Sequence, residues 1–167
     1  AHCRSHSTPI ETERGAFIGD ERSRRMDVFA VPGLPEIQTG DDLAAVIDDA
    51  VDLQPDDVVC VASTIVSKAE GRTRDRESFP AGPRAREIAA NMESVTGEEK
   101  DPRFAQAVLE EATEIIVESP FLLTESPFGH VGVNAGIDRS NVPGGDLLLL
   151  PERPTESARR IREGLPA

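Results

Sequence analysis

The chain has 167 residues, a length that suits one domain with its own hydrophobic core. Its 31 acidic and 18 basic residues give a net charge of −13. Nucleic acid and anionic membrane surfaces are therefore not expected as partners, because binding either of them requires a basic surface. The sequence also contains no apolar stretch long enough to cross a bilayer as a helix, so no membrane partner is expected.

The two cysteines, Cys3 and Cys60, do not make a disulfide framework. Cys3 lies in an irregular segment and Cys60 in an apolar run, so both are interpreted as free thiols of a reducing compartment. We therefore expect a cytoplasmic protein. Its acidity, with arginine far more frequent than lysine, favours a halophilic cytoplasm in which salt screens the self-repulsion, and ordinary acidic solubility is the alternative.

The beginning of the chain changes in character near residue 26. Residues 1–25 are polar and aperiodic and end in an arginine cluster, which predicts a disordered leader. The structured domain is predicted to cover residues 26–167. Its first element is predicted to be a strand over residues 26–31, where apolar and polar residues alternate.

The next part of the chain is predicted to contain a helix and a strand. Leu43, Val46 and Ile47 recur at helical spacing in a segment that begins near Thr39. Residues 56–62 include five apolar positions in a row and are predicted to form a buried strand, which leads into a loop around Lys68. Residues 72–83 are polar and contain prolines, so a further loop is expected there.

The second half of the chain mixes helices with adjacent strands. Helices are predicted over residues 83–95 and from 102 to about 112, the second with Asp101 as N-cap and Pro102 in the first turn. Strands are predicted over residues 114–118, 121–125, 130–133 and 146–150, and a last helix over 155–163. Because several strands follow one another without an intervening helix, we expect an α+β fold with mixed, largely antiparallel sheets packed with helices.

Lys68 is one of only two lysines in the chain. It lies in the segment Ser63-Thr64-Ile65-Val66-Ser67-Lys68-Ala69-Glu70-Gly71. A lone ammonium group near hydroxyls and a glycine suits a phosphate, and the alternative is a solvated lysine. The sequence has neither a Walker-type phosphate loop nor a Gly-x-Gly-x-x-Gly motif.

A second polar segment, residues 134–141, follows a predicted strand. Asp138 can supply a carboxylate to a hard cation such as Mg²⁺, and Asn141 can hydrogen-bond a nucleotide. The alternative is a turn in which these side chains cap their own backbone. No cysteine and histidine cluster has zinc spacing, and the single histidine after the leader, His130, does not support a Ser-His-Asp triad.

Several segments in matching order resemble the coenzyme F-420-0:L-glutamate ligase family, the γ-glutamyl ligases of deazaflavin coenzyme biosynthesis. They are residues 31–37, 40–43, 63–71, 104–111 and 134–141 and the leucine run that ends at Pro151. The sequence is most similar to haloarchaeal members, and the resemblance covers the N-terminal portion of the family, so the fold is expected to be incomplete relative to the full family fold.

The resemblance implies a function and a set of site residues. It implies a ligase that uses GTP to activate a carboxylate of coenzyme F-420-0 as an acyl phosphate, which the amine of L-glutamate then attacks. A divalent cation, Mg²⁺ or Mn²⁺, is implied at Asp138, and K⁺ and a homodimer are implied for the full-length family. The GTP contacts implied are Leu34, Pro35, Glu36, Ile37, Ser63, Thr64, Lys68 and Asn141.

No catalytic residue is assigned in this portion of the chain. The resemblance implies that further metal ligands and nucleotide contacts lie in the second half of the family sequence. The alternative to an active ligase is therefore an inactive or split GTP-binding fragment that needs a separate C-terminal half.

Overall fold

The structure is a computed structural model that describes residues 27–142 and 146–166. The chain divides into a first unit, residues 1–30, and a second unit, residues 31–167, which holds every described helix and strand. The predicted leader lies outside the described residues. Residues 27–30 form neither helix nor strand, so over these positions the predicted first strand is wrong. Val28 is 85% and Phe29 69% exposed, and an alternating pattern forms a strand only where a neighbour completes its hydrogen bonds.

Two helices form one wall of the larger hydrophobic cluster. Helix α3 (Pro83–Thr96) buries Ala85, Ile88, Ala89 and Met92 at helical spacing, and it ends at Gly97, whose φ of 71° is left-handed. Helix α4 (Pro102–Glu111) begins where the Asp101 carboxylate accepts a hydrogen bond from the Arg103 N–H. Both helices and the Asp101 cap confirm the prediction from sequence.

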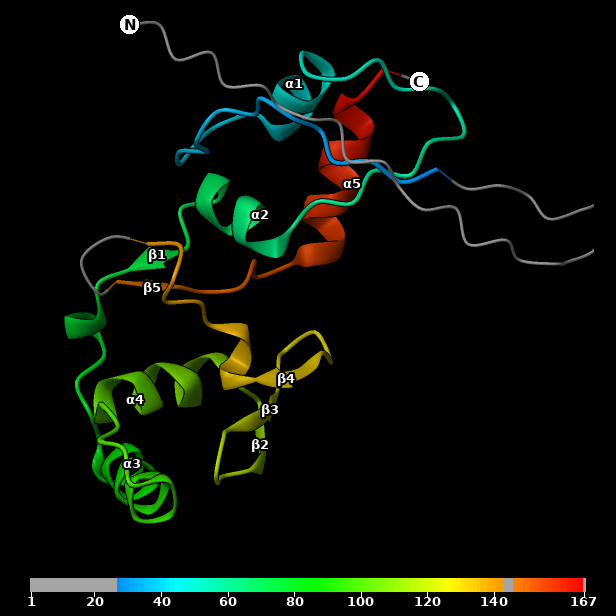
Figure 1. Ribbon diagram of the computed structural model, residues 1–167. Coiled ribbons are helices and arrows are strands. Elements are labelled where there is room, and N and C mark those ends of the chain that lie inside the picture. The colour runs from blue at the N-terminus through cyan, green and yellow to red at the C-terminus, as the bar shows by residue number, and fades with distance from the viewer. Residues whose placement is uncertain (1–26, 143–145, 167) are drawn as a thin grey trace, which may run out of the picture. The chain divides into compact units, whose positions relative to one another are not determined.

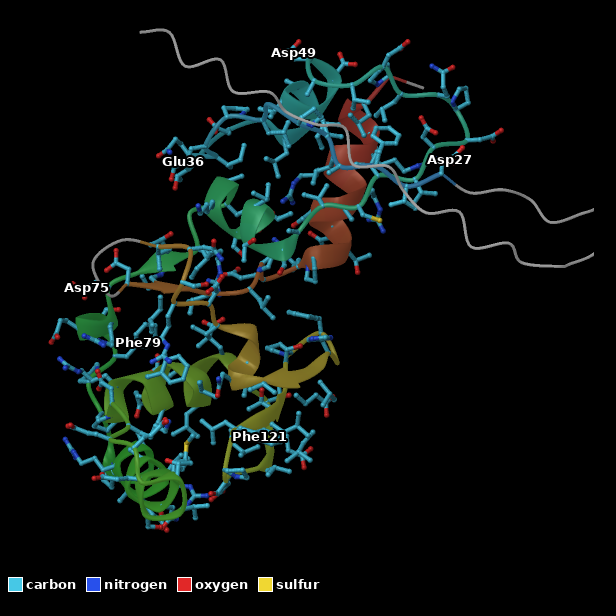
Figure 2. The ribbon with its side chains drawn as sticks, viewed as in Figure 1. Asp27, Glu36, Asp49, Asp75, Phe79 and Phe121 are labelled. Carbon is cyan, nitrogen blue, oxygen red and sulfur yellow. The ribbon has the colours of Figure 1, made fainter. Side chains whose placement is uncertain are left out.

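A three-stranded antiparallel sheet faces the same cluster. It is formed by β2 (Glu114–Val117), β3 (Leu123–Glu125) and β4 (Val131–Val133), with β3 in the centre (Figure 1). Ile115 pairs with Thr124, and the register shifts before Val117 pairs with Leu123. Phe79, Leu122, Val108 and Leu147 are among the buried residues of this cluster, and Figure 2 labels Phe79 beside it.

A second, smaller ladder connects distant parts of the chain. Strand β1 (Thr73–Arg74) pairs antiparallel with β5 (Leu147–Leu148), so that Thr73 lies opposite Leu148. Leu147 and Leu148 are buried at 0% and 1% exposure, as predicted for the leucine run. The antiparallel pairing in both sheets, together with the helices, confirms the predicted α+β class.

Three further helices surround a smaller hydrophobic cluster, whose buried residues are Ile37, Leu43 and Val66. Helix α1 (Leu43–Asp48) starts after Asp42, whose carboxylate accepts hydrogen bonds from the backbone of Ala44 and Ala45. The helix begins at Leu43, four residues after the predicted start near Thr39, and Asp42 is its N-cap. Helix α2 (Ser63–Ala69) contributes Val66, and α5 (Pro154–Gly164), which confirms the predicted last helix, contributes Ile161.

Three predictions between α1 and α3 are wrong. Residues 56–62 are not a buried strand: they have no regular structure, and Val58 is 87% exposed. The run is apolar and β-prone, but no described strand lies beside it, and a strand exists only with a hydrogen-bonded neighbour. Lys68 lies on helix α2 rather than in a loop, and the loop expected over residues 72–83 contains β1 and the 3-10 helix η1 (Arg76–Ser78).

None of the described helices is long and apolar enough to cross a membrane.

Candidate functional site

Helix α2 buries the two residues that precede Lys68 more deeply than Lys68 itself. Val66 and Ser67 are buried at 8% and 1% exposure, whereas Lys68 is only partly buried. Within the described part of the chain, no carboxylate forms an ion pair with the Lys68 ammonium group. Lys100, the other lysine, pairs with Glu98 at 2.7 Å. Among the described residues, the charge of Lys68 is therefore not paired with a carboxylate.

The segment of Leu34, Pro35, Glu36 and Ile37 is held against α2. Ile37 is 5% exposed and packs in the smaller cluster with Val66 of α2. Leu34, Pro35 and Glu36 are exposed, and Glu36 lies on the loop that precedes α1 (Figure 2). Burial of one apolar side chain thus anchors the segment and leaves the three preceding residues open to a ligand.

Two hydrogen bonds fix the chain just after this segment to the last turn of α2, which carries Lys68. The Gly40 N–H donates to the Ala69 carbonyl at 2.8 Å, and the Thr39 hydroxyl donates to the Lys68 carbonyl at 3.3 Å. Gly71 makes the close approach possible, because a Cβ at this position would lie 2.8 Å from Cγ2 of Thr39. The left-handed φ of 65° at Gly71 also disfavours any other residue.

Ser63 and Thr64 form the first turn of α2. Ser63 is exposed and Thr64 is half-buried, and neither hydroxyl is hydrogen-bonded to any residue that the structure describes. These hydroxyls lie one to two helical turns from Lys68 in the same short helix. The structure therefore joins three of the predicted nucleotide contacts on one element.

Asp138 and Asn141 are in direct contact. Oδ1 of Asp138 accepts hydrogen bonds from the Ser140 N–H at 2.7 Å and from the Ser140 hydroxyl at 2.6 Å, and Oδ2 accepts one from Nδ2 of Asn141. These donors lower the pKa of the Asp138 carboxyl to about 2, from an ordinary 3.8. The carboxylate is therefore ionised at neutral pH and held in a fixed orientation.

The local geometry of this turn matches the self-capping alternative stated from the sequence, since Asp138 accepts from the backbone two residues later. Within residues 27–142 and 146–166, no group of three or more His, Cys, Asp and Glu side chains is arranged to hold a metal ion. Asp138 is thus not accompanied, within these residues, by two further carboxylate, imidazole or thiol side chains placed to share a metal ion.

Strand β5 relates the α2 region to the Asp138 turn. Leu148 exchanges two backbone hydrogen bonds with Asp138, both at 2.9 Å. On its other side Leu148 lies opposite Thr73 of β1, which follows α2 after only three residues. The two polar segments, 70 positions apart in sequence between Lys68 and Asp138, therefore flank the same buried strand.

Two residues that support the site were not predicted. The Arg139 guanidinium lies 4.6 Å from the ring centroid of Phe104 on α4, which holds the Asp138 turn against that helix. Arg72, just before β1, donates to the Leu150 carbonyl and to the carboxylates of Glu111 and Glu152. No local pattern indicates these contacts, because each partner of Arg72 is at least 39 residues away in sequence.

Comparison with known proteins decides the family. Residues 33–167 match the family model described as F420-0:Gamma-glutamyl ligase. The chain belongs to the F420-0:gamma-glutamyl ligase family. The match covers the whole of the site described above and confirms the resemblance noted from the sequence.

Relatives within the F420-0:gamma-glutamyl ligase family are named coenzyme F420:L-glutamate ligase. The one from Halorubrum lacusprofundi is 70% identical over 142 residues, which are 85% of this chain and 57% of the relative. The one from Halobacterium salinarum is 68% identical over 142 residues, 85% of this chain and 56% of the relative. The one from Archaeoglobus fulgidus is 50% identical over 138 residues, 83% of this chain and 53% of the relative.

Two of these three relatives are haloarchaeal, in agreement with the expected type of family member. The chain spans a little over half the length of the relatives it matches. The roles of its individual site residues remain predictions. In the structure, Ile37 packs against α2, which carries Lys68, and Asp138 is hydrogen-bonded to β5, whose partner strand β1 follows α2.

Proposed function

We propose that this chain forms the GTP-binding part of a ligase that joins L-glutamate to coenzyme F-420-0. The observation that carries this proposal is the family match over residues 33–167, together with the name coenzyme F420:L-glutamate ligase shared by the relatives. The geometry supports it, because α2 and the loop packed against it hold together an exposed segment and, among the described residues, a lysine without a carboxylate partner and two hydroxyls without hydrogen bonds.

In the proposed reaction, a carboxylate oxygen of F-420-0 bonds to the γ-phosphorus of GTP and GDP leaves. The amine nitrogen of L-glutamate then bonds to the acyl carbon, the amine loses a proton and inorganic phosphate leaves. Phosphoryl transfer requires positioning and charge neutralisation more than covalent help from the protein. The Lys68 ammonium would neutralise phosphate charge, the hydroxyls of Ser63 and Thr64 would donate to phosphate oxygens, and Asn141 would donate to the nucleotide.

Asp138 fits the divalent cation implied by the family only as one ligand. Its carboxylate is a hard oxygen donor and is ionised, which suits Mg²⁺ or Mn²⁺, and such ions often take one or two protein carboxylates with phosphates and water. When bound, the cation would shield the charge on the phosphates. No described residue is assigned to K⁺, and no step is assigned to either ion.

A second candidate is a split protein that binds GTP only when combined with a separate C-terminal half. One observation favours it: among the described residues, no three His, Cys, Asp or Glu side chains are arranged to hold a metal ion. On this reading the chain alone binds GTP weakly. The family resemblance adds a homodimer as the proposed assembly of the complete protein, to be checked by sedimentation.

The experiment compares two polypeptides: the 167-residue chain, and the same chain fused to the part of the Halorubrum relative that has no counterpart here. Each is assayed for GDP release with GTP, Mn²⁺, L-glutamate and F-420-0, and GTP binding is measured by isothermal titration. Activity in the fusion protein alone supports the split form. Activity of the chain alone, or micromolar GTP affinity without the added part, contradicts it.

The two lysines provide a matched pair of variants for the GTP site. Lys68→Ala in the active form is expected to weaken GTP binding by at least about tenfold, because a charge-assisted phosphate contact is worth roughly 1.5–3 kcal/mol. Lys100→Ala, which removes the lysine paired with Glu98, is expected to change GTP affinity by less than about twofold. Equal effects of the two substitutions would remove Lys68 from the proposed site.

A further inference from the structure

A pocket lies where the end of α4, the turn between β3 and β4 and the segment after β5 meet. Its volume is about 440 Å³, within the roughly 300–1,000 Å³ typical of small-molecule sites. Its charged lining consists of two guanidinium groups and three carboxylates, those of Arg72, Arg153, Glu110, Glu111 and Glu152. Such a lining is unsuitable for an apolar ligand and suits a small molecule that carries both an ammonium group and carboxylates.

Two buried side chains that line the pocket have hydrogen-bond donors to spare. Ser126 is 4% exposed, and its hydroxyl oxygen accepts from the His130 N–H at 3.1 Å, but no described residue accepts the hydroxyl hydrogen. The Arg72 guanidinium uses one N–H of each nitrogen, which leaves a second N–H on both terminal nitrogens without an acceptor in the described part of the chain. A buried donor without an acceptor is costly, and the carboxylate of a ligand would satisfy these donors.

The end of α4 offers carboxylate oxygens with spare acceptor capacity. Oε2 of Glu111 accepts from Arg72 at 2.7 Å, whereas nothing among the described residues donates to its Oε1. Burial is the main cause that raises the pKa of Glu111 above its ordinary 4.5, so Arg72 compensates its charge only in part. A second cation beside Glu111, such as an ammonium group, would stabilise the ionised form.

The pocket adjoins both polar segments of the candidate functional site. Arg72 lies four residues after Lys68 along the chain. Ala135, which is 5% exposed, also lines the pocket and lies three residues before Asp138. A ligand in this pocket would therefore lie beside the segments that carry the proposed phosphate and cation contacts, as an amine that attacks an acyl phosphate requires.

We infer that this pocket binds L-glutamate, the amine substrate of the proposed ligase. Arg72 and Ser126 donate to its α-carboxylate, Glu111 accepts from its ammonium group, and Arg153 pairs with its side-chain carboxylate. The choice of this amino acid rests on the proposed function, whereas the position of the site rests on the lining of the pocket. Three carboxylates in that lining oppose the more highly charged phosphates of GTP at the same place.

Amide NMR of the 167-residue chain tests the position of this site without GTP or F-420-0. Titration with L-glutamate is expected to shift the signals of Ser126 and Ala135 with a Kd on the order of 1 mM. The signals of α3, which does not line the pocket, should stay unchanged, and KCl at equal ionic strength serves as the blank. No saturable shift at Ser126 and Ala135 would overturn the inference.

Glutarate, which is glutamate without its amine, tests the role of Glu111. Glu111→Gln keeps an oxygen acceptor for Arg72 and removes the negative charge, so L-glutamate should bind about tenfold more weakly and glutarate no more weakly. Because both ligands are compared on the same variant, a loss of stability does not produce this difference. Glu93→Gln, which changes an exposed carboxylate on α3, is the matched control and should alter neither affinity. Equal weakening of both ligands by Glu111→Gln, or the same selective loss in Glu93→Gln, would overturn the inference.

L-2-Aminobutyrate, which lacks the side-chain carboxylate, tests Arg153 in the same way. Arg153→Gln should weaken binding of L-glutamate by about threefold and should leave that of L-2-aminobutyrate unchanged, and an equal loss for both would contradict the assigned contact. These titrations contain no nucleotide, so their failure is distinguishable from that of the proposed function. If GTP binds and the ligase reaction occurs while L-glutamate leaves the pocket signals unchanged, only this inference fails.

Discussion

Substitution of Arg72 tests how the segment before β1 is joined to helix α4 and to the segment after β5. Its side chain is only 11% exposed, and its three hydrogen bonds reach the Leu150 carbonyl at 2.9 Å, Glu152 at 2.8 Å and Glu111 at 2.7 Å. Replacement by methionine keeps an unbranched apolar stem and removes the charge and all donors. It leaves the Glu111 carboxylate, with 25% of its side chain exposed, without its counter-ion.

The expected cost of Arg72→Met is about 3 kcal/mol, the lower end for breaking a buried ion pair, because Glu111 retains some contact with water. Glu152 is 69% exposed and adds little to this figure. At roughly 3 °C per kcal/mol for a domain of this size, the melting temperature should fall by about 9 °C. Thermal and urea unfolding of the purified chain measure both quantities.

The matched control is Glu152→Gln, which removes an exposed partner of the same arginine and should cost less than about 1 kcal/mol. The double variant Arg72→Met with Glu111→Gln should recover part of the loss, because the unpaired buried charge is then absent. If Arg72→Met destabilises the chain no more than Glu152→Gln does, the buried ion pair between Arg72 and Glu111 does not stabilise the fold.

The pH dependence of the stability of Arg72→Met has a defined sign. Burial raises the pKa of Glu111 above 4.5, and Arg72 acts in the opposite direction. Because the folded state binds this proton more readily than the unfolded state, Glu111 favours folding at low pH, and this contribution is lost as the pH rises through its folded pKa. Without Arg72 that pKa rises further, so the stability difference between variant and wild type should shrink on acidification.

Three other substitutions have defined outcomes. Thr124→Val should cost about 2 kcal/mol in urea unfolding, because it leaves the Ala135 N–H without the hydroxyl that accepts its hydrogen bond at 2.9 Å in the buried core. Ser140→Ala should raise the pKa of Asp138 from about 2 toward 3.8 in a carboxyl NMR titration; an unchanged pKa would contradict the assigned cause. The stability that the depressed pKa contributes above pH 3.8 should then be lost at a higher pH during acidification. Lys68→Ala should leave the free energy of unfolding within about 0.5 kcal/mol, since no described ion pair is lost; a larger change in thermal unfolding would show a structural role.

Elements with a complete local pattern were predictable from the sequence. The helix that starts at Pro102 has an N-cap, a proline in its first turn and apolar residues at helical spacing, and α3 and α5 have comparable patterns. The strands β2, β3 and β4 are separated by short turns, so their partners are close in sequence. In each case the information that specifies the element lies within it or next to it.

The failures concern features whose partners are distant. Residues 56–62 have the composition of a strand, but strand formation depends on a neighbour that the described residues do not supply. The sequence predicts a loop around Lys68 because a buried strand is expected just before it, yet Ser63–Ala69 form helix α2, whose Val66 packs in the smaller cluster. Within the candidate site, the contact between Asp138 and Asn141 was within reach of sequence reasoning, whereas the alignment of Asp138 with Leu148 was not.

The two hydrophobic clusters differ in size, and the candidate site draws on both. Ile37, Ser63 and Lys68 depend on the smaller cluster, which has three buried residues, whereas the Asp138 turn is attached to β5 beside the larger one. The smaller cluster should therefore open at a lower free energy than the larger one, and the proposed nucleotide contacts should be lost before the chain unfolds as a whole. A ligand that contacts both Lys68 and the Asp138 turn would act as a non-covalent cross-link. It would stabilise the region of the smaller cluster more than the region of the larger cluster.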